Sequence, residues 1–283
     1  MDNRYVEDFK KIINISANSL IKWLNQKLTK EFNYKTILKE KDYLYAEGDI
    51  PLMLVAHLDT VFRENYKILY YDPIAMVAWS PDGAGFDDRA GVLGILTILK
   101  NIKVKPHILF TMEEEKGGRG ARAAASELNM RNKLKYIIEL DRRGKNDCVF
   151  YDCHNEYFKN YVESFGFKTD TGSFSDISFL GPVWNVAAVN LSIGYEDEHT
   201  YAEHLNFNYW IYTIQKVIKM IKNINNSKYY KFLDKHSKKV KAEVVCECCG
   251  YAYPIDSIVQ VMDVPFCIDC YNTYIKDDWG EHF

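Results

Sequence analysis

The chain has 283 residues, of which 47% are hydrophobic, with a formal net charge of −3 and seven cysteines. This length predicts one or two domains with a sizeable core, and no apolar stretch reaches the roughly 18 residues that a membrane-spanning helix requires. The chain begins Met-Asp-Asn-Arg without an apolar leader, so we expect a cytoplasmic protein.

Apolar residues at helical spacing in residues 5–28 predict a pair of core-facing helices. Four later apolar runs, at 51–56, 108–112, 136–140 and 186–193, have the length and β-branched content of buried strands. Helices are predicted over 89–100 and 120–128, and a strand at 148–153 precedes a helix at 155–165. This alternation predicts an α/β fold with a mostly parallel sheet.

Imidazoles and carboxylates recur near the ends of the apolar runs. They are His57, Asp59, Asp87, Glu114, Glu115, Asp141 and His199. Successive acidic groups lie 26 to 28 residues apart, close to the length of a strand–helix–strand unit, so we expect them at the carboxyl ends of neighbouring strands. Oxygen and nitrogen ligands without sulfur suit zinc, cobalt or manganese. The set predicts a metal-dependent hydrolase in which two ions share one carboxylate.

Each group also has a simpler structural interpretation. Asp87 and Asp88 could cap the helix that follows them, and residues 113–115 could be a solvated charge run. Asp141 and His199 could be surface side chains. Because all of these would have to coincide at strand ends in one chain, we favour the metal site.

The amino-acid sequences of these segments resemble those of the co-catalytic metallopeptidases of the M28, M42 and M20 groups, which are aminopeptidases and related hydrolases. The resemblance covers roughly residues 35–225. It rests on AHLDTV (56–61), GFDDRAG (85–91), EEKGGRGA (114–121) and NLSIGY (190–195) with the histidine that follows. It implies a three-layer sandwich around a mixed, mostly parallel central sheet, as in zinc peptidases.

The resemblance implies a ligand set for two divalent ions, with zinc as the first expectation and cobalt or manganese as alternatives. Asp87 would bridge both ions. Glu115 and His199 would complete one site, and His57 and Asp141 the other.

The resemblance also implies catalytic roles beside the ligands. Asp59 would orient the imidazole of the first histidine, and Glu114 would be the general base for a metal-bridging water. Ser175, Asp176 and Tyr195 are candidate substrate-binding residues, although a helix cap at Ser175 is an equal alternative.

The resemblance makes a peptide-cleaving exopeptidase, first of all an aminopeptidase, the leading function, with a peptide or small amide as substrate. A deacylase, carboxypeptidase or other amidohydrolase such as a glutaminyl cyclase is second, and a non-catalytic binding protein third. Many relatives carry an inserted domain, for which the intervals in this chain are too short. We therefore expect a compact catalytic domain, closest in plan to the M28 type, and leave a homo-oligomer open.

A second candidate metal site lies near the end of the chain. Cys246 and Cys249, and Cys267 and Cys270, form two C-x-x-C pairs separated by 17 residues, which is typical of structural zinc. Four thiolates leave no open position for catalysis. Short strands at 251–254 and 258–262 favour a zinc ribbon or a treble-clef-like knuckle. Disulfides or redox chemistry are the alternatives.

The expected division is a catalytic domain at 1–226, a lysine-rich linker at 227–243 and a four-cysteine zinc ribbon at 244–283. Residues 242–283 carry eight acids and one base, which makes nucleic-acid binding a poor hypothesis. Residues 216–241 carry nine lysines and one acid. We expect these two segments to attract one another, and docking near the pocket mouth would let the ribbon limit substrate length.

Overall fold

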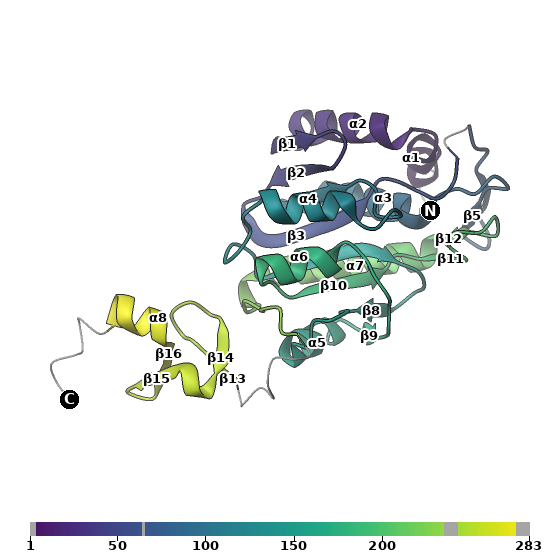
Figure 1. Cartoon of the computed structure of the whole chain (residues 1–283). Helices are drawn as coiled ribbons and strands as arrows, with labels where there is room; N and C mark the ends of the chain where they lie inside the picture. The colour runs from purple at the N-terminus through teal and green to yellow at the C-terminus, as the bar shows by residue number, and fades with distance from the viewer. Residues whose placement is uncertain (1–3, 64–65, 235–242, 276–283) are drawn as a thin grey trace.

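The computed structural model describes residues 4–63, 66–234 and 243–275. An eight-stranded mixed sheet of order β1-β2-β6-β3-β7-β10-β8-β9 forms its centre (Figure 1). The strands are β1 (Lys35–Lys39), β2 (Tyr43–Glu47), β3 (Ile50–His57), β6 (Pro106–Thr111), β7 (Tyr136–Arg142), β8 (Asp147–Val149), β9 (Lys168–Thr169) and β10 (Ala188–Ser192). The central strands β6, β3, β7 and β10 run parallel, so their carboxyl ends meet at one edge.

Helices cover both faces of this sheet, which confirms the α/β class. One layer contains α1 (Arg4–Ile13), α2 (Ala17–Lys30), α3 (Phe86–Asn101), α5 (Glu156–Glu163) and α7 (Phe207–Lys222), and the other contains α4 (Arg119–Glu127) and α6 (Ile177–Trp184). Strand β3 shows why both layers are needed. Leu52, Leu54 and Ala56 belong to the first buried cluster, and Met53 and Val55 to the second. Alternate side chains of a strand point to opposite faces, so a strand that is apolar throughout requires cover on both.

A small second sheet was not predicted. It has the order β11-β12-β5-β4 and consists of β4 (Tyr70–Asp72), β5 (Val77–Trp79), β11 (Tyr195–Glu196) and β12 (His204–Asn206). Strands of two or three residues are too short to show a periodicity of two. The β4–β5 hairpin fills the interval between Asp59 and Asp87, so the expectation of a strand–helix–strand unit there was wrong.

The predicted N-terminal helix pair is present as α1 and α2, and its apolar face packs into the first cluster. Phe9 makes edge-on ring contacts with Phe86 and Phe207, at centroid distances of 5.6 and 5.5 Å. These contacts fix α1 against the beginning of α3 and the beginning of α7. Within the described part of the chain, no helix combines the length and the apolar character needed to span a membrane.

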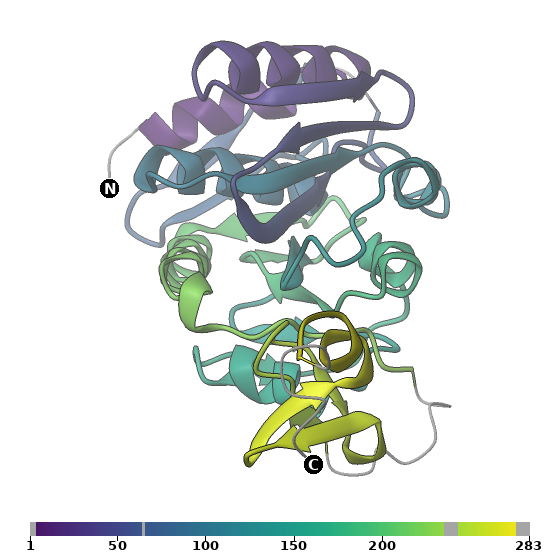
Figure 2. The same cartoon turned by 90° about the vertical axis from the view of Figure 1, so that its left-hand side faces the viewer.

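Residues 243–275 form a separate small unit, here called the four-cysteine module. It contains two hairpins and short helices: β13 (Glu243–Val245), β14 (Ala252–Pro254), η2 (Ile255–Ser257), β15 (Ile258–Val261), β16 (Val264–Cys267), α8 (Ile268–Cys270) and η3 (Tyr271–Ile275). Figures 1 and 2 show it beside the lower part of the rest of the fold, near α5.

The chain reaches the four-cysteine module along the amino ends of the parallel strands, after the short helix η1 (Ile224–Asn226). The backbone of Tyr230 pairs with Lys135, just before β7, and with Ala187, just before β10. The functional groups predicted from the sequence follow the opposite, carboxyl ends of these strands. The expectation that the module sits at the pocket mouth is therefore wrong.

Ring contacts hold the module to this edge. The ring centroids of Tyr229 and Tyr251 are 4.6 Å apart, and the Lys231 ammonium lies 3.9 Å from the ring centroid of Tyr253. The contact at this lysine is a cation–π contact, and the expected attraction between acids and lysines stays a prediction. The lysines at 235–241 and the acids at 277–281 lie outside the described residues.

Candidate metal centre

The first group of possible ligands consists of His57, Asp87 and Asp141. His57 ends β3, and its Nε2 lies 2.9 Å from Asp87 Oδ1 and 3.5 Å from Asp141 Oδ1. Asp141 lies near the carboxyl end of the neighbouring strand β7. All three side chains are almost fully buried. The structure thus brings these residues together where parallel strands end.

The second group consists of Asp87, Glu115 and His199. His199 Nε2 lies 3.0 Å from Asp87 Oδ2 and 3.0 Å from Glu115 Oε1. The two oxygens of the Asp87 carboxylate therefore face different imidazoles. One carboxylate placed between two histidines in this way is the arrangement that a shared, bridging ligand requires.

Asp59 and Glu114 lie beside these groups without belonging to either. One Asp59 oxygen lies 3.5 Å from His57 Nδ1, at the outer limit of hydrogen bonding. The Asp59 carboxylate also accepts the backbone N–H groups of Glu114 and Glu115, at 3.1 and 3.2 Å. Asp59 thus faces the imidazole, as predicted, and also fixes the turn after β6. The contact with the turn was not anticipated.

The two neighbouring aspartates have separate tasks. Asp87 enters both ligand groups, whereas Asp88 is fully buried and accepts the N–H groups of Gly91 and His57. The bond to Gly91, three residues later, makes Asp88 the cap of the regular part of α3. The structure therefore supports the cap interpretation for Asp88 and leaves Asp87 as a candidate ligand.

The electrostatics of the centre favour bound cations. Burial, together with neighbouring carboxylates such as Asp87, raises the pKa of Glu114 to about 9 and that of Asp141 to about 7. A hydrogen bond to Asp87 raises the pKa of His199 to about 9. Burial opposes the charged form of His57, but the carboxylates around it outweigh this effect and raise its pKa.

Five carboxylates thus converge with only two imidazoles to balance them. Buried charges of one sign are unfavourable unless they are paired or bind metal. The donor set of oxygen and imidazole nitrogen, with the ligand atoms of each group within 4.8 Å of one another, fits a pair of divalent ions.

A cavity of about 310 Å³ opens on these groups. Its wall includes Tyr195, whose hydroxyl donates to Asp141 Oδ1 at 3.1 Å. Ser175 and Asp176 do not line it: Ser175 donates to Glu139, and Asp176 accepts from Thr111, in a buried layer behind it. Ser175 does not cap α6 through its side chain either: the N-cap is Asp176, without a side-chain cap bond, and the Ser175 hydroxyl accepts from the Asn190 side chain.

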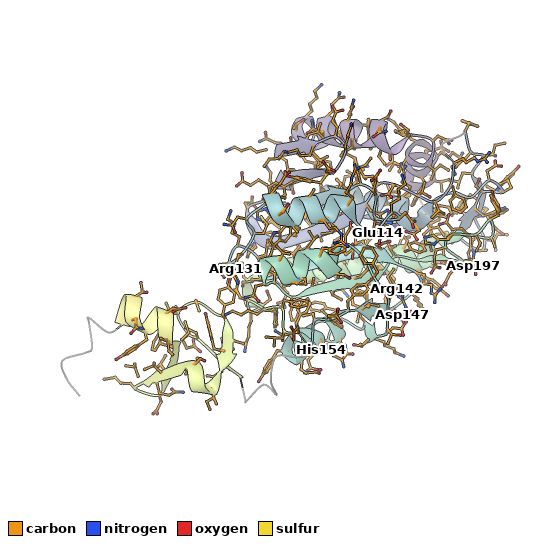
Figure 3. The ribbon with its side chains drawn as sticks, in the orientation of Figure 1. Glu114, Arg131, Arg142, Asp147, His154 and Asp197 are labelled. Atoms are coloured by element: carbon orange, nitrogen blue, oxygen red, sulfur yellow. The ribbon has the colours of Figure 1, made fainter. Side chains whose placement is uncertain are left out.

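Two arginines of the cavity wall had no predicted role, whereas Glu198 was one of three acids considered for binding a substrate amine. Arg142, Arg143 and Glu198 line the cavity, and Arg143 pairs with Glu198 at 2.9 Å. In Figure 3, Glu114 and Arg142 lie near the middle of the domain, while Arg131 lies at the end nearer the four-cysteine module. Arg142 and Arg143 follow Asp141 directly in the sequence, which was the one signal that pointed to them.

Asn190 is a further contributor that sequence reasoning missed as an individual residue. Its side chain accepts the N–H of Asp141 at 2.9 Å and donates to the carbonyl of the same residue at 2.8 Å. The pairing of β10 with β7 shifts register between Asn190 and Ser192. The amide side chain replaces a backbone partner at this irregularity and holds Asp141 in place.

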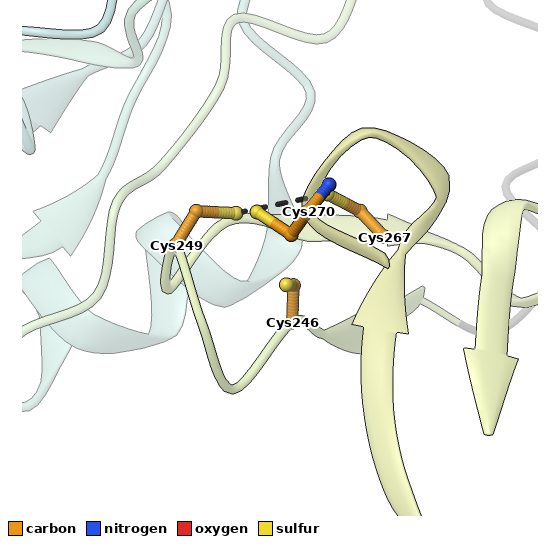
Figure 4. A group of neighbouring side chains, drawn as sticks. All are labelled: Cys246, Cys249, Cys267 and Cys270. Atoms are coloured by element: carbon orange, nitrogen blue, oxygen red, sulfur yellow. Dashed lines mark hydrogen bonds between the residues drawn. The ribbon is translucent and has the colours of Figure 1, made fainter. Parts of the chain in front are cut away.

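The four paired cysteines form the second metal candidate (Figure 4). The sulfur atoms of Cys246, Cys249, Cys267 and Cys270 lie within 4.8 Å of one another. Burial raises the pKa of Cys246, but backbone N–H groups outweigh it and lower the pKa to about 7, which favours the thiolate of this residue. Burial raises the pKa of Cys249 and Cys270. All seven cysteines are free thiols, and Cys248 is exposed outside the group.

The second cysteine pair lies where β16 passes into α8. A zinc ribbon would carry each pair in a knuckle between strands. A strand-to-helix junction instead matches the treble-clef-like alternative that the sequence left open.

The chain is similar to a known protein family in sequence and to solved structures in fold. The sequence profile of Peptidase family M20/M25/M40 matches residues 53–260. No curated protein sequence matches the chain significantly.

Solved structures show the same fold. Aminopeptidase PepT from Bacillus cereus has a TM-score of 0.62 at 15% identity, over 79% of this chain and 98% of its own. A tripeptidase from Staphylococcus aureus has a TM-score of 0.62 at 15% identity, over 80% and 99%. A TET aminopeptidase from a marine-sediment Thaumarchaeota archaeon has a TM-score of 0.58 at 11% identity, over 79% and 99%. At these identities the likeness concerns the fold.

Proposed function

The chain belongs to Peptidase family M20/M25/M40, and from this premise we propose that it is an aminopeptidase with two divalent ions in its active site. The observation that carries the proposal is the pair of ligand groups that share Asp87. His57 and Asp141 complete one group, and Glu115 and His199 the other. Zinc is the first candidate for both ions, with cobalt and manganese as alternatives.

The reaction is hydrolysis of a peptide bond. When bound, the ions supply polarisation of the scissile carbonyl and a lower pKa for the attacking water. Glu114 lies in the cavity wall outside both ligand groups. The positive charge of bound ions would lower its raised pKa, so that its carboxylate could take one proton from the water as the new C–O bond forms. It then gives that proton to the leaving nitrogen as the C–N bond breaks.

Asp59 and Tyr195 support this cycle without exchanging protons. Asp59 holds the backbone of Glu114 and Glu115, which keeps the base and a ligand in fixed relation. The Tyr195 hydroxyl donates to Asp141 and thereby restricts the rotation of that carboxylate.

Glu198 is the best candidate to receive the α-amino group of the substrate. Three further acids lie near the centre in the sequence: Asp176, Glu196 and Glu198. Asp176 is buried behind the cavity, and Glu196 is not part of the cavity wall, whereas Glu198 is. An ammonium group could share its carboxylate with Arg143, which now bonds one of the two oxygens.

A matched peptide pair tests this assignment. Peptides with a free N-terminus should be cleaved, and the same peptides with an acetylated N-terminus should not. Glu198→Gln should raise KM for the free peptides, with Glu196→Gln as the control that leaves KM unchanged. Preferential cleavage of the acetylated set would instead identify a deacylase.

For the four-cysteine module we propose one structural zinc ion held by its paired cysteines. Four sulfur ligands close a tetrahedron, and so small a unit gains most of its folding free energy from the metal. A cytoplasmic location and assembly into a homo-oligomer remain predictions.

A further inference from the structure

Glu203 is a fully buried acid with no predicted role, and it lies directly behind the metal centre. Its carboxylate accepts three successive backbone N–H groups. Oε2 accepts from Gly85 at 2.7 Å and from Phe86 at 3.1 Å, and Oε1 accepts from Asp87 at 3.1 Å. The last of these N–H groups belongs to the residue that both ligand groups share.

The loop before α3 cannot supply these bonds itself. The first N–H groups of a helix have no partner within the helix, and a side chain at the N-cap position usually accepts one of them. Here the N-cap is Gly85, with a φ of 69° and no side chain to accept a bond. A Cβ at this position would lie 2.6 Å from Thr60 Oγ1, so a capping side chain cannot be accommodated. The cap comes instead from 118 residues away.

Burial raises the pKa of Glu203 to about 7, while the three N–H groups favour its charged form. Lys67 is buried and donates to the carbonyl of Gly83. Burial lowers the pKa of Lys67, and the charge of Glu203 partly opposes this effect. Hydrogen bonds to a charged acceptor are roughly twice as strong as those between neutral groups. The loop from Gly83 to Asp87 is thus held at both ends by hydrogen bonds to buried side chains, Lys67 at one end and Glu203 at the other.

We propose that Glu203 is the positioning residue for Asp87, and through it for both ions of the centre. The proposal rests on the proposed two-ion function. Because Asp87 is the one residue common to both ligand groups, displacing its backbone should weaken both ions together. A residue that supports only one group, such as Asn190, should weaken one ion more than the other.

The test measures ion affinity in the full-length protein. Zinc is added to metal-free protein in competition with a chromophoric chelator, and the four-cysteine module provides an internal reference because it lies at the opposite edge. Glu203→Gln retains the shape of the side chain but removes the charge and faces an N–H group with its own NH₂. We expect affinity for both centre ions to fall by about 10–100-fold, with the ion of the four-cysteine module unchanged.

Two controls separate positioning from general destabilisation. Glu196→Gln is the same chemical change in β11, which pairs with β12, the strand just after Glu203, and it should leave both affinities at the wild-type value. Val217→Ala removes buried apolar groups from α7 and should lower the melting temperature without changing either affinity. If Glu203→Gln does not fold, Glu203→Asp keeps the charge with a shorter reach and should give an intermediate loss.

The outcomes separate the two proposals. Wild-type protein that binds no ion outside the four-cysteine module would refute the two-ion function itself. Wild-type protein that binds two such ions, together with a Glu203 variant of unchanged affinity, would refute the positioning role alone. A loss confined to one ion, or an equal loss in Val217→Ala, would also overturn it.

Discussion

Two adjacent glutamates are placed so that one can bind metal and the other can transfer a proton. Glu115 reaches within 3.0 Å of His199, whereas Glu114 belongs to neither ligand group. The turn that carries them begins at Glu113, which has a φ of 59°, and the Asp59 carboxylate fixes both N–H groups. Neighbouring side chains diverge on such a turn, so one carboxylate can bind metal while the other transfers a proton.

Exchanging Glu114 for glutamine should remove the proton transfer and leave the ions in place. We expect Glu114→Gln to lower kcat by about 10²–10⁴-fold with the wild-type metal content. Kinetics on a free-amine dipeptide and elemental analysis of the same sample measure both quantities. Loss of an ion in this variant would instead make Glu114 a ligand, and full activity would exclude it as the base.

A second residue-scale prediction concerns pH and a histidine remote from the centre. Burial lowers the pKa of His107, whose Nδ1 contacts the Tyr45 hydroxyl at 2.7 Å and accepts the N–H of Gly48 at 3.1 Å. Because the neutral ring is favoured only in the folded state, the unfolded chain binds a proton first as pH falls. The stability contributed by His107 is therefore present above pH ~6.5 and is lost below it.

The substitution His107→Asn tests this assignment, because an asparagine oxygen can replace Nδ1 as the acceptor but does not titrate. Between pH 7 and 5 the free energy of unfolding should fall less steeply in this variant than in the wild type. His154→Asn, the same change at an exposed histidine, should leave the slope as it is. Equal slopes in all three proteins would refute the assignment.

At the scale of elements, the irregular pairing of β10 with β7 serves the first ligand group. The register shift after Asn190 leaves the backbone of Asp141 without a regular ladder partner, and the Asn190 amide supplies both bonds instead. Irregularities of this kind are frequent beside active sites because they redirect a side chain.

Removing this amide should therefore affect one ion selectively. Asn190→Ala is expected to weaken the ion held by His57 and Asp141 by about 10–100-fold, with a smaller effect on the ion held by Glu115 and His199. Asn155→Ala, at a buried asparagine that caps α5, is the matched control. Chelator competition resolves the two affinities, and an equal loss at both ions would contradict the selective role.

The elements also show how far the sequence could predict the site. The apolar runs that became β3, β6, β7 and β10 carry their ligands to one edge because parallel strands share a direction, so His57, Glu115 and Asp141 could be placed in advance. Asp87 lies beside these residues for a different reason: it follows a hairpin of the second sheet and not a strand of the main sheet. Strands of two or three residues leave no pattern from which that hairpin could be read.

Glu203 could not have been predicted for a related reason. Its partners are backbone N–H groups 116 to 118 residues away, and a backbone group has no sequence signature. A lone glutamate in a polar loop ordinarily indicates a solvated side chain. Only the glycine at position 85, which offers the first N–H groups of α3 no side-chain acceptor, hints that a distant acceptor is required.

At the scale of the whole molecule, the four-cysteine module and the metal centre lie at opposite edges of the sheet. Tyr230 anchors the connection, because its ring is buried and lies 5.1 Å from that of Phe158 and 5.5 Å from that of Tyr161. The module contacts the residues on either side of Tyr230, namely Tyr229 and Lys231.

Two truncations separate these contributions. A chain that ends after residue 234 should keep both centre ions and the wild-type preference for peptide length, because it retains the Tyr230 anchor. A chain that ends after residue 227 should melt at a clearly lower temperature, since it exposes the aromatic cluster. A changed length preference in the longer truncation would show that the module acts on the active site after all.

The central claim is that Asp87 is shared by two ions. An anomalous difference map from crystals of the zinc-loaded, full-length protein, recorded at the zinc absorption edge, tests it most directly. We predict three peaks: one among Cys246, Cys249, Cys267 and Cys270, and two at the metal centre, each within ligand distance of a different oxygen of Asp87. A single peak at the centre, or two peaks of which only one contacts Asp87, would contradict the account.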